Sequence, residues 1–499
     1  MVGKRYLVFI ETGTAVEDGG VYPERNTEMP IGPDAAAPNK TAILAIILIS
    51  YVMIVLDISI VLTGLPRIHA ELGFSDAGLA WVSTAYTLTF GGCLLLGARA
   101  GDIFGRRRMF LVGLTIFSLA SLVIGVSQTP ALMIAARALQ GLGSAILAPS
   151  TLALLQTNFE PGAERMRAVS YYAAAAGVSA AFGLVIGGLL ADWLSWRVGF
   201  FINLPIGIAM MIAAKRHVRE TERTPGTFDI AGAIISTLGI VALVYGVIRS
   251  ASTGWSDVTT QACIGFGIVM LILFAVVESH ASQPIMPLSL FTDRERSAAY
   301  AARALFLGAN VGFYFFVAQF LQSVVGLSSS EAGIAFLPTT VVNFIVAMSA
   351  PRLIGRYGAG RVLVTSVVTG LIGMIWLSFA MQQASLAALV IPMMLIGAGQ
   401  GGALGPLTAS GIARVPSERA GAASGVVNVA HQLGSSLGLG VLVAVAAIGS
   451  QGLQGTELLA RRASVAMETG SVLIAMTLIL AVMFMARPRA RLENASTLA

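Results

Sequence analysis

The feature that most constrains this chain is a series of long apolar runs, each about as long as a helix needs to be to cross a lipid bilayer. Of its 499 residues, 56% are apolar and only 11% are charged. A soluble protein could not bury that much apolar surface, so the chain belongs in a membrane. The sequence predicts an all-α integral membrane protein with fourteen transmembrane helices. They cover residues 42–65, 78–98, 109–127, 131–156, 168–190, 197–214, 228–249, 261–279, 299–322, 333–352, 361–381, 386–410, 421–447 and 470–486.

One short stretch between the second and third runs sets the orientation of all the others. Residues Gly97–Phe110 hold four arginines against a single acid, Asp102. Short loops rich in Arg and Lys lie on the cytoplasmic side of a membrane, and alternation then places every other loop. On this assignment 24 of the 31 Lys and Arg residues fall in cytoplasmic loops and tails, and five fall in outer loops. The bias favours an even number of helices with both termini in the cytoplasm.

The same composition excludes several other classes of protein. The net charge of +6 sits in short loops rather than in one patch, so nucleic acid is not a predicted partner. Both cysteines, Cys93 and Cys263, lie inside apolar runs, and the sequence shows no metal-ligand cluster. It contains no nucleotide-hydrolysis or hydrolase motif, and the G-x-G-x-x-G pattern at 397–402 lies inside an apolar run with no strand before it. We therefore expect no cofactor, no metal and no enzyme activity.

A weak internal repeat predicts how the helices are grouped. Leu72–Ser75 resembles Val325–Ser328 at an offset of 253, and Gly105–Arg108 resembles Gly358–Arg361 at the same offset. Repeated halves are typical of secondary transporters, which bind substrate where the halves meet. We expect a disordered cytoplasmic tail at 1–40, a six-helix bundle at 41–217, a linker and two-helix insert at 218–297, a second six-helix bundle at 298–487 and a cytoplasmic tail at 488–499.

Asp57 is the first candidate for chemistry, because it lies inside the first apolar run. It precedes Leu65 by eight residues, which places it roughly 12 Å from the outer end of that helix. A carboxylate at this depth costs several kcal/mol unless it is paired, protonated or facing water. Such an acid is suited to binding and releasing a proton. The alternative is a structural aspartate that is hydrogen-bonded to a neighbour.

Arg137 is the second candidate, at a similar depth in the fourth run. It follows Ala131 by six residues, or roughly 9 Å of helix, and a buried guanidinium needs a partner. We hypothesise that Asp57 and Arg137 face one cavity and influence each other's charge state. The alternative is that Arg137 extends outward to the membrane interface. Three further charged residues near helix ends are interpreted in that way: Glu278, His280 and Arg303.

The basic loop also has a specific spacing of residues. Gly101 and Asp102 are followed by Gly105 and then by Arg106 and Arg107. This spacing resembles the signature loop of the major facilitator superfamily, a family of secondary transporters. The resemblance implies two six-helix bundles that rock around a central site, with Asp102 and Arg106 as an inner-loop latch. Asp102 would either cap the positive N-terminal end of the third helix or pair with an arginine across the inner gate.

Further segments resemble motifs of the fourteen-helix drug:proton antiporter branch of that superfamily. They are a first-helix motif at Leu56–Pro66, a helix-four motif at Arg137–Gly143, an antiporter motif in helix five that includes Gly183, Gly187 and Gly188 and is followed by Ser195–Pro205, and a helix-thirteen segment at Gly425–Gly434. The resemblance implies that Asp57 is the proton-coupling acid and Arg137 the basic residue of helix four. Two positions depart from the pattern: Leu184 stands where the family usually has proline, and His431 where members more often have arginine.

A second set of residues is predicted to contact the substrate. Asn310 aligns with Asp57 at the repeat offset, and Tyr314 and Gln319 follow it on the same helix. Aromatic and amide side chains suit an amphipathic aromatic compound, while packing against lipid explains the aromatic residues equally well. His431, near the middle of helix thirteen, is either a proton relay or a histidine bonded to a neighbour on its own helix.

The predicted function is proton-driven export of amphipathic drugs or antibiotics across the cell membrane. The alternative is a proton symporter that imports a small metabolite, which Leu184 keeps open. A membrane enzyme or a sensor is disfavoured, since the sequence offers neither a nucleophile–base pair nor a soluble output domain. The expected partners are an amphipathic small molecule, protons and the lipid bilayer, and the protein is expected to be a monomer.

Overall fold

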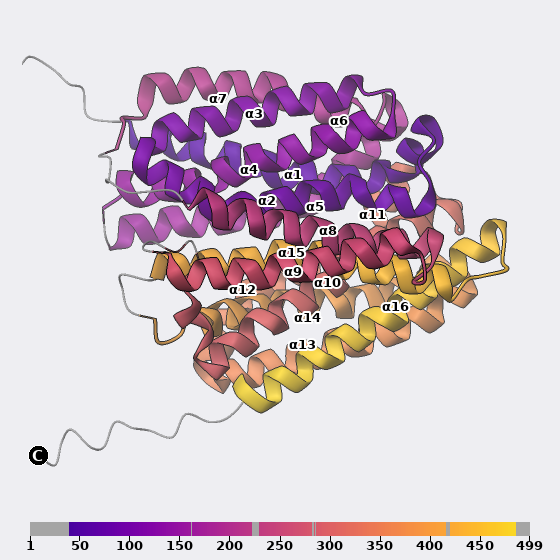
Figure 1. Cartoon of the computed structure of the whole chain (residues 1–499). Helices are drawn as coiled ribbons and strands as arrows, with labels where there is room; N and C mark the ends of the chain where they lie inside the picture. Colours follow the sequence, from indigo (N-terminus) through magenta and orange to yellow (C-terminus); the bar gives the residue numbers. More distant parts are fainter. Residues whose placement is uncertain are drawn as a thin grey trace, which may run out of the picture. The chain divides into compact units, whose positions relative to one another are not determined.

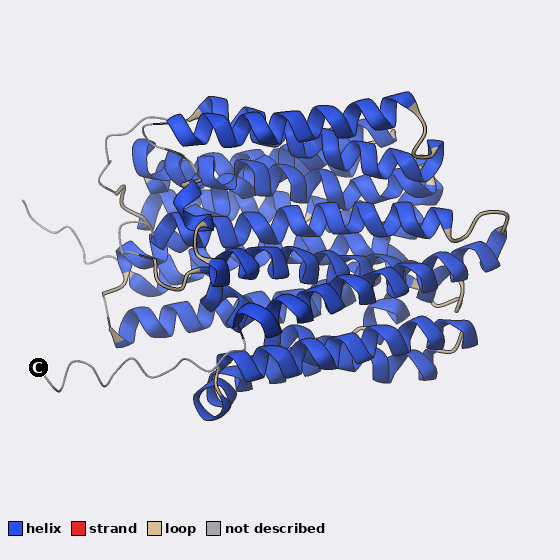
Figure 2. Cartoon of the chain, turned by 60° about the horizontal axis from the view of Figure 1, so that its bottom comes forward, coloured by secondary structure: helices blue, strands red, loops and turns tan. Residues whose placement is uncertain are grey.

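The computed structural model of the chain describes residues 39–160, 162–221, 229–281, 284, 286–415 and 420–485. The expected tails at 1–40 and 488–499 lie outside these residues, apart from residues 39 and 40. The regular elements of the described residues are all helices (Figure 2).

The N-terminal half begins at Lys40, and side-chain caps set the starts of several of its helices. Asn39, Ser75 and Thr129 each accept a hydrogen bond from the backbone N–H three residues later, which satisfies a donor that the first turn leaves free. The helices of this half are α1 (Lys40–Leu72), α2 (Asp76–Phe104), α3 (Arg106–Val126), α4 (Pro130–Asn158), α5 (Ala163–Trp193), α6 (Val198–Phe201) and α7 (Asn203–His217). Together α6 and α7 make one span.

We call the next two helices the insert and the remaining elements the C-terminal half. The insert consists of α8 (Ile230–Thr253) and α9 (Val258–His280). The C-terminal half contains η1 (Leu288–Phe291), α10 (Arg294–Ser323), α11 (Ser329–Ala335), α12 (Leu337–Tyr357), α13 (Ala359–Ala380), η2 (Met381–Gln383), α14 (Leu386–Gly411), α15 (Ala420–Ile448), α16 (Gly455–Leu480) and η4 (Ala481–Met485). Here α11 and α12 make one span.

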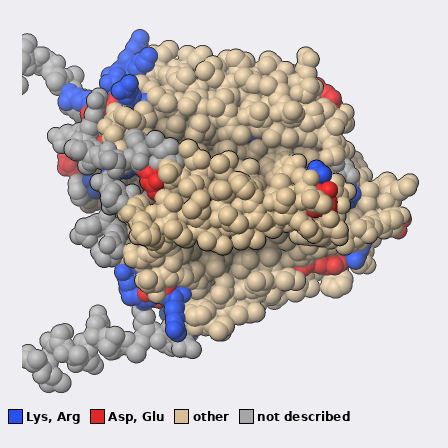
Figure 3. Space-filling model, viewed as in Figure 1, with Lys and Arg blue, Asp and Glu red and all other residues tan. Residues whose placement is uncertain are grey.

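The helices are long enough, and apolar enough, for the predicted membrane fold. Thirteen spans among the described residues have the length and composition to cross a bilayer, and α5, at 31 residues, supplies the fourteenth. The prediction of a fourteen-helix membrane fold is confirmed. Large apolar side chains such as Ile272 and Met348 are 60–61% exposed. In Figure 3 a broad band without charges separates basic side chains gathered at one end of the helices from a mixed, partly acidic opposite end.

Several helices extend beyond their apolar runs. α1 continues to Leu72 rather than ending at 65, and α16 starts at Gly455, 15 residues before the predicted start at 470. As a result Arg67, Arg461 and Arg462, which were predicted in outer loops, lie within helices. An apolar run marks only the part of a helix that sits in hydrocarbon, because a helix can continue into water with polar side chains.

The predicted repeat is visible in the backbone of the two halves. Gly73 and Gly326 both have positive φ, at 69° and 83°, and each is followed two residues later by a serine that caps the next helix. Gly105 and Gly358 likewise have φ of 101° and 85° and directly precede α3 and α13. Because only glycine adopts such φ values readily, the repeat has a conformational basis. We call the end of the helices with Gly105 and Gly358 the inner end, and the opposite end the outer end.

The two halves meet along pairs of helices and are joined by hydrogen bonds. α2 packs on α15 and α5 on α11, while α8 lies against both α2 and α15, so that the insert covers one seam between the halves (Figure 1). At the outer end, the carboxylate of Asp192 in α5 accepts hydrogen bonds from the backbone N–H of Ser329 (3.2 Å) and Ser330 (2.6 Å) in α11. Gln322 Nε2 donates to Thr63 O at 3.1 Å. The outer end is therefore closed.

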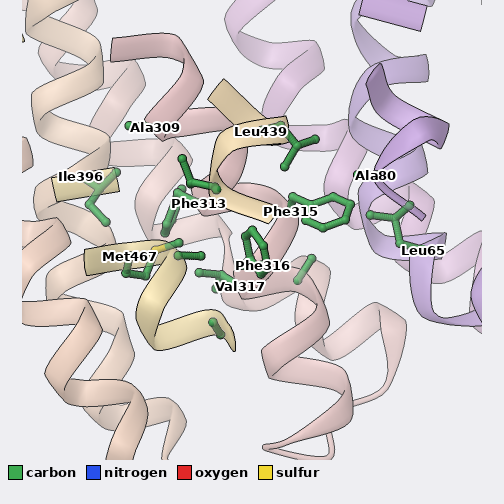
Figure 4. Close-up of a cluster of buried hydrophobic side chains, with 14 of the residues drawn as sticks. Leu65, Ala80, Ala309, Phe313, Phe315, Phe316, Val317, Ile396, Leu439 and Met467 are labelled. Carbon is green, nitrogen blue, oxygen red and sulfur yellow. The ribbon is translucent and has the colours of Figure 1, made fainter. Parts of the chain in front are cut away.

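The apolar core continues from one half to the other. Phe313, Phe315 and Phe316 of α10 are at most 8% exposed, and Figure 4 shows Phe315 reaching toward Leu65 and Ala80 of the N-terminal half. The alternative offered for the aromatic residues of this helix, packing against lipid, is wrong for these three phenylalanines, because they are buried inside the protein.

Candidate functional site

Asp57 lies near the middle of α1 and is 1% exposed. Its carboxylate accepts three hydrogen bonds: from Arg137 Nη1 to Oδ2 (2.6 Å), from Gln140 Nε2 to Oδ1 (2.8 Å) and from Asn203 Nδ2 to Oδ1 (3.1 Å). These donors come from α4 and α7. The acid therefore points into the interior of the N-terminal half and not toward lipid.

Arg137 is also 1% exposed and is held by several groups besides the acid. Its Nε donates to the backbone oxygen of Val82 in α2 (2.8 Å), and its Nη1 donates to Gln140 Oε1 (2.6 Å). The guanidinium carbon lies 4.4 Å from the ring centre of Tyr86, a cation–π contact. The interpretation that Arg137 extends to the interface is wrong. The structure brings Arg137 and Asp57 together, but it encloses them rather than placing them on a shared cavity, and their role in proton coupling stays a prediction.

Three polar residues that sequence reasoning did not single out complete the cluster. Ser121 Oγ of α3 accepts hydrogen bonds from Gln140 Nε2 (2.7 Å) and Asn203 Nδ2 (3.3 Å), and donates to Phe117 O (2.8 Å). Gln140 stands one helical turn after Arg137, which was a usable signal because residues three apart share a helix face. Ser121 carried no such signal, since a serine in an apolar helix commonly bonds its own backbone. We call Asp57, Arg137, Gln140, Asn203 and Ser121 the acid cluster.

The donors around Asp57 match the hydrogen-bonding needs of an ionised carboxylate. Every side chain that contacts the Asp57 carboxylate donates to it, which is the arrangement that an ionised carboxylate requires. If either carboxylate oxygen were protonated, its O–H would point at N–H groups of the neighbouring side chains, which are themselves hydrogen-bond donors. A proton on Asp57 would remove the negative charge opposite Arg137 and so weaken the contact between the two side chains.

The three glycines predicted as the antiporter motif sit where helices approach closely. A Cβ atom at Gly183 would lie 2.6 Å from Ser59 Cβ, and one at Gly187 would lie 2.6 Å from Ile60 Cα, so both glycines let α5 pack on α1. A Cβ at Gly188 would overlap the backbone of Ser329 in α11. Gly188 is thus required for the contact between the two halves at the outer end, while the other two serve packing within the N-terminal half.

The basic stretch differs from the predicted loop. α2 runs to Phe104 and α3 starts at Arg106, so Gly105 alone joins them, and its N–H donates to Gly101 O at 3.1 Å. Asp102 pairs with Arg106, four residues on, at 2.9 Å. Asp102 and Arg106, which the resemblance implies form a latch, are therefore in contact. Both belong to the joint between α2 and α3, which we call the inner joint.

The residue that caps α3 is not the one that was proposed. Glu220, which follows α7, accepts hydrogen bonds from the backbone N–H of Arg107 and Arg108, both at 3.0 Å. Arg107 also donates from Nη2 to Lys215 O (3.1 Å). Neither alternative for Asp102, capping α3 or pairing across the gate, is what the structure shows. The capping acid was missed because it lies more than one hundred residues along the chain.

The three predicted substrate residues on α10 lie in three different environments. Asn310 is 2% exposed, and its Nδ2 donates to Phe306 O of its own helix (2.7 Å). Gln319 lines a cavity of about 220 Å³ at the outer end, together with Phe315 and Phe316. Tyr314 donates to Gln400 Oε1 of α14 (3.2 Å). These three residues do not form one site in this conformation.

A second cavity lies between α12 and α14, in the C-terminal half, and holds about 250 Å³. Asn343 and Gln400 supply its polar side chains and are themselves bonded, Asn343 Nδ2 to Gln400 Oε1, at 2.9 Å. The glycine pattern discarded as a dinucleotide site runs along α14 here, and a Cβ at Gly401 would overlap the Asn343 backbone oxygen. Close helix packing is what those glycines provide.

His431 and Arg303 lie together. Arg303 is 7% exposed and donates from Nη2 to His431 Nδ1 (3.2 Å) and from Nη1 to Thr408 Oγ1 (2.7 Å). The interpretation of Arg303 as an interface residue is wrong, and so is that of Glu278, which is 3% exposed. The hydrogen-bond partner of the His431 side chain is Arg303 of α10 and not a neighbour on its own helix, and a proton-relay role for His431 stays a prediction. Within the described part of the chain, no group of three or more His, Cys, Asp or Glu side chains could hold a metal ion.

Comparison with known proteins places this arrangement in a family. Residues 47–439 match the Major Facilitator Superfamily. The chain is 35% identical over 428 residues to the cephamycin export protein CmcT of Amycolatopsis lactamdurans, covering 84% of this chain and 88% of that one. It is 36% identical over 416 residues to the puromycin resistance protein pur8 of Streptomyces alboniger, covering 82% of each.

Solved structures agree on the fold. A bacterial homologue of the human lysosomal transporter Spinster, in an inward-facing and occupied conformation, superposes with a TM-score of 0.62 at 15% identity, covering 90% of this chain and 97% of that one. A POT family transporter in complex with 5-aminolevulinic acid gives a TM-score of 0.66 at 12% identity, covering 90% and 96%. The chain is a multi-pass membrane protein and belongs to the major facilitator superfamily.

Proposed function

We propose that this protein exports amphipathic compounds, drugs or antibiotics among them, from the cytoplasm across the cell membrane in exchange for protons. The observation that carries the proposal is the enclosed contact of Asp57 with Arg137 inside a membrane-spanning bundle. An acid at this depth is a functional site by default. The export and resistance names of the two relatives support the direction of transport. Both termini would lie in the cytoplasm, and the protein would act as a monomer without an enzymatic step.

The acid cluster suggests how a proton would be coupled to movement. In the conformation described here the outer end is closed and Asp57 is arranged as an ionised acid. A proton arriving at Asp57 would remove the charge that holds Arg137, and α1 and α4 would lose their strongest link. Loss of the proton to the cytoplasm would restore the link. Coupling follows because the two protonation states favour different contacts between the same helices.

Import by symport is the alternative, and one sequence feature favours it. Leu184 replaces the usual proline of the antiporter motif, and its backbone oxygen lies against Gly333 of α11 in the closed outer end. A proline would not remove that oxygen, but it would bend α5 at this contact. The direction of transport therefore needs a direct test.

Accumulation of test compounds in cells that overproduce the protein provides this test. Export predicts less accumulation than in control cells, with the difference abolished by an uncoupler and by Asp57→Asn. The matched control is Asp257→Asn, which neutralises an acid at the start of α9 outside the cluster and should leave export unchanged. Greater accumulation that depends on the proton gradient would establish import instead, and a difference that survives the uncoupler would contradict proton coupling.

A further inference from the structure

The C-terminal half buries an arginine that has no acidic partner among the described residues. Arg303 Nη1 and Nη2 donate to Thr408 Oγ1 and His431 Nδ1, and its Nε is buried without a hydrogen-bond partner. Arg303 is only 7% exposed. A charged group in such a place is costly unless an opposite charge joins it. The geometry leaves Nε unpaired and leaves the positive charge of Arg303 without an acidic partner among the described residues.

The contact with Arg303 also determines what His431 offers. A guanidinium has donors only, so Nδ1 of His431 accepts from Arg303 Nη2. The neutral imidazole then carries its proton on Nε2, which is a second donor. Thr408 Oγ1 uses its own proton on Leu404 O (2.7 Å). Arg303, His431 and Thr408 together thus present N–H donors and one positive charge. None of the three side chains carries a negative charge that would balance it.

This group lies one helical turn from the cavity between α12 and α14. Leu404, whose backbone oxygen receives the hydrogen bond of Thr408, lines that cavity, and so does Gly405. A Cβ atom at Gly405 would meet no heavy atom within 4 Å, so there is open space beside α14 at this position, three residues before Thr408. The cavity lining itself is mostly apolar, with Asn343 and Gln400 as its polar side chains.

We propose that Arg303, His431 and Thr408 form a binding site for the carboxylate, or an equivalent anionic group, of an amphipathic substrate whose apolar body occupies the cavity between α12 and α14. The inference rests on the proposed export function and narrows it to weak organic acids. A carboxylate would accept from the Arg303 guanidinium and from His431 Nε2, and would supply the missing counter-charge. Charge-assisted hydrogen bonds of this kind are about twice as strong as neutral ones.

Direct binding to the purified protein tests the site without requiring transport. The probes are three amphipathic acids, dansyl-undecanoic acid, fusidic acid and salicylic acid, each compared with its own methyl ester. We expect at least one acid to bind about tenfold or more tightly than its ester, and Arg303→Gln to abolish that preference. Arg294→Gln is the matched control, because Arg294 is an exposed arginine on the same helix and its loss should leave the preference intact.

Two more variants keep the test decisive. Arg303→Lys retains the charge and should retain part of the preference even if Arg303→Gln does not fold. Gly405→Leu, which fills open space in the cavity, should weaken acid and ester alike and leave their ratio unchanged. Equal binding of every acid and ester, or an unchanged preference in Arg303→Gln, would overturn the anion site. Such a result would leave proton-driven export standing, whereas a protein that binds acids but shows no proton-driven transport would contradict the proposed function alone.

Discussion

The N-terminal half and the C-terminal half each bury an arginine in a bundle of helices, but they surround it differently. Arg137 contacts a carboxylate, an amide oxygen and a backbone oxygen, so that its charge and its donors are largely satisfied. Arg303 contacts a hydroxyl and an imidazole, and one donor stays unpaired. At the repeat-related position of Asp57, the C-terminal half has Asn310, which bonds its own helix.

The difference suggests that the two halves, although related by a repeat, have different functions in transport. In the proposed function, the acid cluster changes its contacts when a proton arrives. In the proposed anion site, Arg303 gains its counter-charge when an anion arrives. Because a group saturated by the protein has little left to offer a ligand, the proton and the substrate are expected to act on opposite halves.

The largest expected effect comes from breaking the complete cluster. Arg137→Met leaves Asp57 as a buried acid without its counter-charge, which typically destabilises a protein by about 3–5 kcal/mol. Thermal unfolding in detergent should show a clear fall in Tm. The double variant with Asp57→Asn should be less destabilised than the sum of the two single changes, since the pair is removed together. Additive effects would mean that the two residues do not depend on each other.

A smaller effect is expected at the inner joint, where the halves also differ. Glu220 caps α3, whereas among the described residues no side chain accepts a hydrogen bond from the first backbone N–H groups of α13, which follows the equivalent Gly358. Glu220→Ala should therefore cost about 1 kcal/mol, measured as a small decrease in Tm. Glu220→Gln keeps an acceptor oxygen and should lose roughly half as much. An unchanged Tm in Glu220→Ala would indicate that the cap is dispensable and that the halves are alike at this joint.

The smallest expected effect on stability comes from the incomplete cluster. Arg303→Gln removes a buried charge that has no acidic partner among the described residues, so the free energy of unfolding should change by no more than about 1 kcal/mol and is expected to rise. Arg296→Gln on the same helix is the contrast, because its guanidinium donates to the backbone oxygens of Leu290, Ser289 and Ala413 and its loss should destabilise. A fall in Tm for Arg303→Gln as large as that for Arg137→Met would contradict the proposed difference between the two buried arginines.

The fold was largely predictable from the sequence, because fourteen apolar runs and a repeated glycine pattern are local signals. Asp57 and Arg137 could be proposed as partners because each alone is conspicuous in an apolar helix. Ser121 and Glu220 could not, since a serine in an apolar helix is unremarkable by itself and a capping acid from another helix leaves no pattern near α3. Arg303 was assigned to the membrane interface because it lies near the predicted start of its helix, at residue 299. In the structure α10 begins at Arg294, nine residues before Arg303.

Proton movement in reconstituted vesicles tests the central claim, that Asp57 carries the transported proton, most directly. Purified wild type and Asp57→Asn are placed in vesicles with a pH-sensitive dye inside, a pH gradient is imposed, and a transported compound is added. Wild type is expected to dissipate the gradient when the compound is present, and Asp57→Asn is expected to show only the leak of empty vesicles while still folding. Compound-dependent proton flux at the wild-type rate with asparagine at position 57 would contradict the claim.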